Sequence, residues 1–129
     1  IGIMGVQMTK EYKKDKLFFE FDDEIKALQW HSYEVKNLEN NTDVTILASS
    51  SSTKYQIFKY KSHAYGIQFH IEIKNDTVSK WGCVPEYEKA LEETLGPNAL
   101  SDFDHQARTN MLDMNKNAEM LYNNFCKLL

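Results

Sequence analysis

Hydrophobic and polar residues alternate with a period of two in several short stretches of the first 72 residues. The longest stretch runs from Ala64 to Glu72, and one of its faces would carry Tyr65, Ile67, Phe69 and Ile71. Successive side chains of a β-strand point to opposite faces, so this stretch predicts a strand with one apolar and one polar side. Similar patterns predict strands in Ile1–Thr9, Ala27–Val35, Asp43–Ser49 and Lys54–Tyr60.

The period changes to that of a helix in the second half of the chain. Pro85–Leu95 has Pro in its first turn and is followed by Gly96-Pro97, which predicts a helix that stops there. Ser101 is the expected N-cap of a final helix whose apolar residues recur every three or four positions. Short predicted strands joined by short turns and followed by helices indicate one α/β or α+β unit with many antiparallel neighbours.

Two shorter segments complete the prediction. Lys10–Asp15 is expected to be a polar connection, either a solvated loop or the start of a helix, and Leu17–Phe21 a helical turn on the core. Thr77–Trp81 is expected to begin a short helix.

Composition narrows the classes of function and partner. The chain has 129 residues and a net charge of −4, so it suits one domain and lacks the basic surface of a nucleic-acid-binding protein. Two cysteines indicate a reducing compartment, for which we expect the cytoplasm. No membrane partner is expected, because no run of residues approaches a membrane span. The chain enters an apolar strand directly at Ile1, which suggests a fragment of a larger protein.

His70 and Glu72 would lie on the same face of the predicted strand, one pleat apart. A carboxylate in that position can orient an imidazole that acts as a general base. Every half-buried strand also places polar residues on its solvent face. The alternation alone therefore favours a structural role for both residues.

Other candidate chemistry is weaker. His31, His70 and Glu72 could in principle form a facial metal triad, but the chain lacks the short ligand spacings of known zinc or iron motifs, so no metal is expected. Cys83 does not follow a strand that feeds a sharp turn, and Cys126 lies on the final predicted helix. The 129 residues therefore contain no nucleophile that we would assign.

Four segments resemble one known family in order and spacing. Gly66–Glu72 (GIQFHIE) resembles the Gly-Val-Gln-Phe-His-Pro-Glu signature of the class I, triad-type glutamine amidotransferases. Gln29–Tyr33 resembles the Trp-His-Gly/Ser segment of that family. Thr45–Ser49 followed by Tyr55–Phe58 resembles its pair of strands, and Ile1–Thr9 the strand after its nucleophile region. The resemblance extends to about residue 81, continues loosely beyond it, and is greatest to GMP synthase-like or stand-alone members.

The resemblance implies an α/β, flavodoxin-like three-layer fold, of which residues 1–129 would form the C-terminal part of one domain without the N-terminal strands. It implies that His70 and Glu72 are the His and Glu of a Cys-His-Glu triad that hydrolyses glutamine without a cofactor. Ser32 and Tyr33 would bind the glutamine substrate through their main chain, and His31 would be structural. The ammonia would pass to a synthetase partner or domain.

Two departures from the family pattern affect this interpretation. Ile71 replaces the signature proline, although the His and Glu keep their spacing, and the Gly-x-Cys-x-Gly nucleophile elbow is absent. A non-catalytic binding or regulatory module is therefore the alternative. We also expect a fragment of this kind to expose apolar strand surface, which would favour self-association into homo-oligomers.

Overall fold

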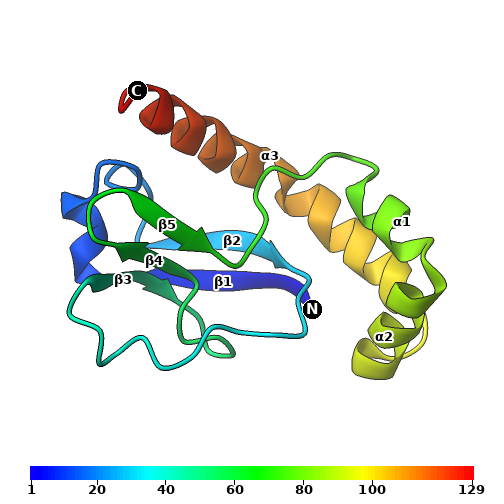
Figure 1. The fold of residues 1–129 in the computed structure, drawn as a ribbon. Coiled ribbons are helices and arrows are strands. Elements are labelled where there is room, and N and C mark those ends of the chain that lie inside the picture. Colours follow the sequence, from blue (N-terminus) through cyan, green and yellow to red (C-terminus); the bar gives the residue numbers. More distant parts are fainter.

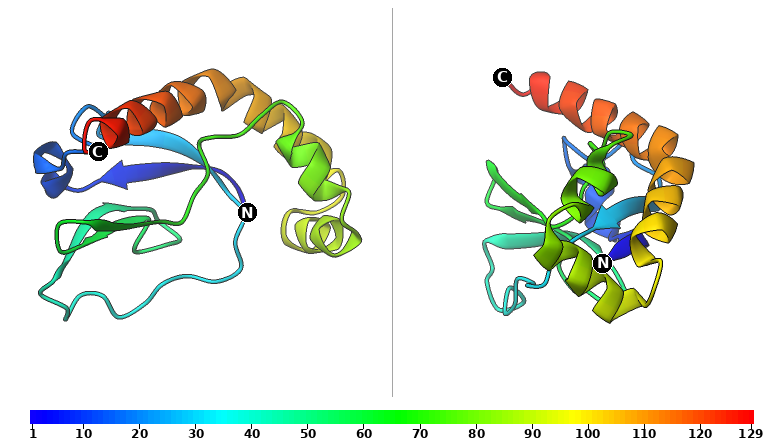
Figure 2. Two further views of the ribbon diagram at one scale, coloured as in Figure 1. Left: turned by 45° about the horizontal axis from the view of Figure 1, so that its top comes forward. Right: turned by 90° about the vertical axis from the view of Figure 1, so that its right-hand side faces the viewer.

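The computed structural model describes all residues from 1 to 129. They form one β-sheet, a short 3-10 helix and three α-helices (Figure 1). The elements in chain order are β1 (Gly2–Met8), the short 3-10 helix η1 (Lys10–Lys14), β2 (Glu24–Gln29), β3 (Val44–Ser49), β4 (Ile57–Tyr60), β5 (Ala64–Ile67), α1 (Thr77–Gly82), α2 (Pro85–Leu95) and α3 (Ala99–Cys126). The long helix α3 packs over β1 and β2, and α1 and α2 gather at its N-terminal end (Figure 2).

The five strands form one antiparallel sheet in the order β2-β1-β3-β4-β5. The predicted antiparallel neighbours β3, β4 and β5 are confirmed. The strand predicted over Ala64–Glu72 is too long, because β5 ends at Ile67. Beyond it the backbone of His70 pairs with Leu28 of β2 through two hydrogen bonds of 2.9 Å.

This pairing determines the shape of the sheet. Since β5 and β2 are its opposite edges, a chain that leaves β5 and bonds to β2 requires the sheet to curl. The alternation in burial continues through the crossing, with Phe69, Ile71 and Ile73 each at most 5% exposed. The buried side chains therefore anchor the segment in the core while its polar residues remain on the other side.

Several predicted boundaries were wrong for identifiable reasons. β2 ends at Gln29, so the alternation beyond it does not belong to a strand, and neither His31 nor His70 lies within one of the five strands. α3 begins at Ala99 after Asn98, whose φ of 66° is left-handed, and not after Ser101. Asparagine tolerates this conformation better than most residues, which allows it to end the preceding turn.

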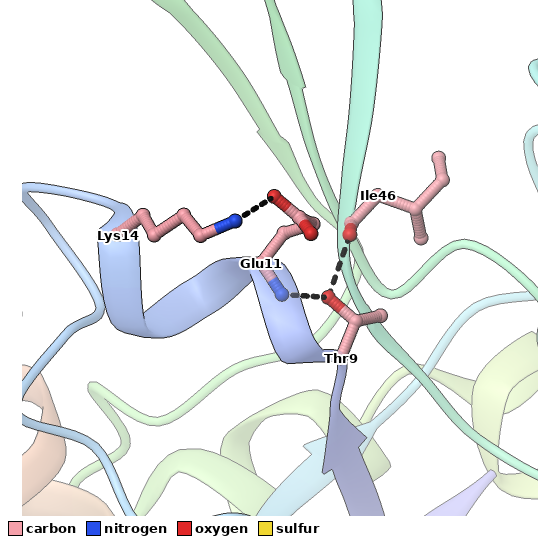
Figure 3. A network of polar contacts seen from close by, with 4 residues as sticks. All are labelled: Thr9, Glu11, Lys14 and Ile46. Carbon is pink, nitrogen blue, oxygen red and sulfur yellow. Dashed lines mark hydrogen bonds and ion pairs between the residues drawn. The ribbon is translucent and has the colours of Figure 1, made fainter.

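The segment predicted to be a polar connection, a solvated loop or a helix start, forms the helix η1, which is tied to the sheet at its start (Figure 3). The hydroxyl of Thr9 donates to the carbonyl oxygen of Ile46 at 2.8 Å and accepts from the backbone N–H of Glu11 at 3.3 Å. Lys14 Nζ lies 3.5 Å from Glu11 Oε2. Tyr12 and Asp15 are buried. The prediction of a solvated segment was therefore wrong at these two residues.

The glycine of the signature segment is explained by its cross-strand neighbour. Gly66 pairs with Phe58 of β4, and a Cβ atom added at Gly66 would overlap the Phe58 ring. The aromatic ring therefore occupies the space that a side chain at position 66 would need.

The apolar stripe of α3 is buried in the first half of the helix, where it contains Phe103, Ala107 and Met114. It becomes exposed near the C-terminus, at Phe125 and Leu128. There it borders an apolar groove of about 520 Å³ beside β5. Self-association through exposed strand surface, as expected from the sequence, stays a prediction. No helix combines the length and the apolar character needed to cross a lipid bilayer.

The carboxylate of Asp15 forms a buried polar cluster that ties η1 to β4 and β5. Its Oδ2 atom accepts from Lys59 Nζ at 2.9 Å and from the Tyr65 hydroxyl at 3.0 Å, and its Oδ1 atom accepts from the backbone N–H of Leu17 at 2.9 Å. The Asp15 side chain is 2% exposed and that of Lys59 20%. The hydrogen bond to Asp15 raises the pKa of Lys59, so the lysine remains charged.

Replacing Asp15 by alanine should therefore be costly. Removing one partner of a buried ion pair leaves the other charge without compensation, so Asp15→Ala should lower the free energy of unfolding by about 3–5 kcal/mol. Urea denaturation of the wild type and the variant measures this difference. Asp22→Ala, at an exposed neighbouring acid, is the control and should change the free energy by less than about 0.5 kcal/mol. Equal losses of unfolding free energy in Asp15→Ala and Asp22→Ala would contradict the assignment of Asp15 to a buried ion pair.

Candidate functional site

The structure brings His70 and Glu72 into direct contact although the strand ends before them. Nδ1 of His70 lies 2.7 Å from Oε1 of Glu72. The second carboxylate oxygen of Glu72 accepts a hydrogen bond of 2.9 Å from the backbone N–H of Ile71. Both oxygens of Glu72 are therefore engaged, and Nε2 of His70 makes no hydrogen bond.

The hydrogen bond from the Ile71 N–H to Glu72 depends on the residue that replaces the signature proline. A proline at this position would have no N–H and could not donate to Glu72. Ile71 replaces the conformational restriction of the proline ring with a hydrogen bond to the carboxylate and with a side chain that is 4% exposed. Sequence reasoning anticipated that the spacing would survive, but it missed this bond.

The pair changes the protonation of both members. The hydrogen bond to Glu72 raises the pKa of the His70 imidazole above its ordinary value, against an opposing effect of partial burial. The hydrogen bond from His70 lowers the pKa of the Glu72 carboxyl, again against partial burial. Each partner therefore favours the charged form of the other.

Two tryptophans, one from α1 and one from the end of β2, line the cavity that His70 borders. The Trp81 ring of α1 packs edge-on against His70, with 5.1 Å between ring centroids and an interplanar angle of 73°. Trp30, which follows β2, packs against Trp81 at 5.5 Å. Together they line an open cavity of about 330 Å³ whose walls are formed by Ile1, Trp30, His31, Ser32, His70, Trp81, Tyr87 and Ala90.

The segment after β2 is held in place by side-chain bonds at both ends. Nδ1 of His31 lies 2.8 Å from the carbonyl oxygen of Tyr33, and its Nε2 lies 2.8 Å from the buried amide of Gln29. The backbone N–H of Val35 donates to Oε1 of Gln68 at 3.3 Å. The glutamine of the signature segment therefore fixes the loop, and His31 links Tyr33 to the end of β2.

The four predicted site residues line three surface cavities. Ser32 and His70 line the same cavity, and Tyr33 lines an adjoining one of about 300 Å³ that shares Ile1, His31 and Ser32 with the first. The Tyr33 side chain points outward and is 88% exposed. Glu72 borders the apolar groove beside α3 instead.

Two other sequence candidates have different surroundings. No three His, Cys, Asp or Glu side chains are arranged to hold a metal ion, and the ring nitrogens of His31 are engaged by Gln29 and Tyr33. Cys83 follows α1 and donates from its thiol to the carbonyl oxygen of Lys80, and Cys126 ends α3. Neither thiol bonds to His70.

The charge coupling within the pair can be tested by Glu72→Gln. An amide supplies much less stabilisation to an imidazolium than a carboxylate does, so the pKa of His70 should fall towards its ordinary value of 6.5. Titration of the histidine ring signals by NMR measures it. His105→Asn on the exposed surface of α3 is the control and should leave the His70 titration unchanged.

The same pair predicts a pH dependence of stability. The raised pKa of His70 stabilises the fold below about pH 6.5, and this contribution is lost as the pH rises through the folded-state pKa of His70. The lowered pKa of Glu72 stabilises the fold above about pH 4.5, and this contribution is lost as the pH falls through the folded-state pKa of Glu72. The difference in unfolding free energy between wild type and Glu72→Gln should therefore be largest between these values. A difference that does not vary with pH would contradict the coupling.

Comparisons with known proteins identify the family of the chain. Residues 1–80 match the family model "Glutamine amidotransferase class-I". A glutamine-hydrolyzing GMP synthase subunit from Picrophilus torridus is 32% identical over 72 residues, which cover 55% of this chain and 37% of that protein. The chain thus spans little more than a third of this curated relative.

Solved structures show the same fold at low sequence identity. A glutamine amidotransferase from Thermotoga maritima matches with a TM-score of 0.73 and 24% identity, over 95% of this chain and 48% of the other. A glutamine amido transferase from Methylobacillus flagellatus matches with a TM-score of 0.71 and 18% identity, over 98% and 51%. The family match covers well over half of the chain, and the predicted α/β fold is confirmed. The chain belongs to the class I glutamine amidotransferase family.

Proposed function

We propose that this chain supplies the histidine and the glutamate of a Cys-His-Glu glutaminase. The observation that carries the proposal is the 2.7 Å contact between His70 Nδ1 and Glu72 Oε1, which leaves Nε2 of the same ring free of hydrogen bonds. A carboxylate on one ring nitrogen fixes the tautomer and leaves the other nitrogen available for proton transfer.

In this mechanism His70 moves protons and Glu72 holds the ring. Nε2 of His70 accepts the proton of a cysteine thiol, and the thiolate attacks the side-chain amide carbon of glutamine to give a tetrahedral oxyanion. His70 then returns the proton to the departing nitrogen, which leaves as ammonia, while the thioester forms. Water attacks the thioester with His70 as base, which releases glutamate and restores the thiol.

The electrostatics of the pair suit this role. The contact with Glu72 raises the pKa of His70, and an imidazolium beside a thiol stabilises the thiolate, which is the reactive species. Packing against Trp81 restricts the orientation of the ring.

Ser32 and Tyr33 would bind the substrate through their main chain. Ser32 lines the cavity that His70 borders, and the Tyr33 carbonyl is held by His31. Because the Tyr33 side chain points into solvent, its identity is free to vary while the backbone contact is kept. We place these 129 residues as the C-terminal part of one amidotransferase domain.

The nucleophile would come from a Gly-x-Cys-x-Gly elbow outside these 129 residues, because Cys83 and Cys126 do not contact His70. The curated relative is named as part of GMP synthase, so the proposed recipient of the ammonia is a synthetase partner or domain. The coding sequence adjoining Ile1 tests the first point. A residue other than cysteine at the elbow would favour the non-catalytic alternative.

Ammonia release from glutamine tests the activity. The 129-residue chain by itself should release none above the blank, and a polypeptide that joins it to the elbow segment should release it. In that polypeptide His70→Asn should reduce kcat by about 10²- to 10⁴-fold, because the proton transfers lose their carrier. The control His105→Asn should retain full activity. Ammonia release by the 129 residues alone, or full activity of His70→Asn, would refute the proposal.

A further inference from the structure

The segment that carries Glu72 is also in contact with the long helix α3. The side-chain amide of Asn115 lies beside the carbonyl oxygens of Ile71 and Ile73, the two residues that flank Glu72. With its nitrogen towards them, the amide donates to Ile73 at 3.0 Å and to Ile71 at 3.3 Å. The opposite orientation would set an amide oxygen against two carbonyl oxygens, so donation is the favoured arrangement.

This contact complements the restraints already described. The side chains of Ile71 and Ile73 are buried, and the Ile71 N–H bonds to the Glu72 carboxylate. Asn115 adds a donor that bridges the carbonyl oxygens of Ile71 and Ile73. The backbone on both sides of Glu72 is therefore fixed by core packing and by one amide from α3.

We propose that Asn115 is a positioning residue of the His70–Glu72 pair, acting by holding the backbone around Glu72 so that the carboxylate meets His70 Nδ1. Its value for glutamine hydrolysis rests on the function proposed above, but the positioning itself is a property of this chain. A comparable amide lies elsewhere on α3, where Asn124 Nδ2 donates to the carbonyl oxygen of Leu17 at 3.1 Å. That second contact is remote in sequence from the pair, and Asn124 is buried, so its removal provides a comparison for a loss of stability alone.

The test is the NMR titration of His70 in the 129-residue chain, with Glu72→Gln as the internal scale. Asn115→Ala removes the bridging donor at an exposed helix position where alanine is well tolerated. We expect it to shift the His70 pKa by at least half of the change that Glu72→Gln produces, and to broaden the signal of the Nδ1 proton. Asn115→Gln, which keeps the amide on a longer stem, should retain more of the wild-type behaviour than alanine does.

Asn124→Ala separates positioning from general stability. It removes the amide that donates to Leu17, so it should lower the thermal midpoint while leaving the titration of His70 unchanged. The proposal is overturned if Asn115→Ala keeps the wild-type pKa of His70, or if Asn124→Ala shifts it as much as Asn115→Ala does. Because the measurement needs no turnover, a failure of glutaminase activity would leave its result interpretable.

Discussion

The arrangement of this molecule depends on the pair of backbone hydrogen bonds between His70 and Leu28. They join a segment that has just left one edge of the sheet to the strand at the opposite edge, so the sheet must curl for them to form. The same two bonds bring the signature segment next to the end of β2, where the Trp30–Tyr33 segment begins. One backbone contact thus produces both the shape of the sheet and the proximity of His70 to Ser32 around a shared cavity.

Different forces hold the two members of the candidate pair. His70 is placed by its backbone bridge to β2 and by the edge of Trp81, whereas Glu72 is placed between two buried isoleucines and held by the Ile71 N–H. The geometry of the pair is therefore the sum of a sheet contact, an aromatic contact and core packing, and it does not require a continuous strand. This explains how His70 and Glu72 meet at 2.7 Å although β5 ends three residues before His70.

Local pattern predicted the helices and most strands well, because periods of two and 3.6 residues report on which side chains are buried. It failed where long-range pairing decides the outcome. The alternation from Ala64 to Glu72 persists in the burial of Phe69 and Ile71, but no local signal shows that the hydrogen-bond partner changes from β4 to β2. The sequence also gives no sign that Asn115 contacts the backbone on both sides of Glu72. An asparagine beside the buried Met114 looks like any polar position on an amphipathic helix. The cluster around Asp15 was missed because a carboxylate among lysines looks solvated until its distant partners Lys59 and Tyr65 are known.

The packing of Phe58 on Gly66 has a consequence for how this sequence can vary. The absence of a side chain at position 66 is imposed by a ring on the neighbouring strand, so the two positions form one steric unit. A larger residue can enter at 66 only if the residue at 58 becomes smaller or turns away. A larger residue at position 66 should therefore be tolerated only together with a smaller residue at position 58, because the Phe58 ring fills the space beside the glycine.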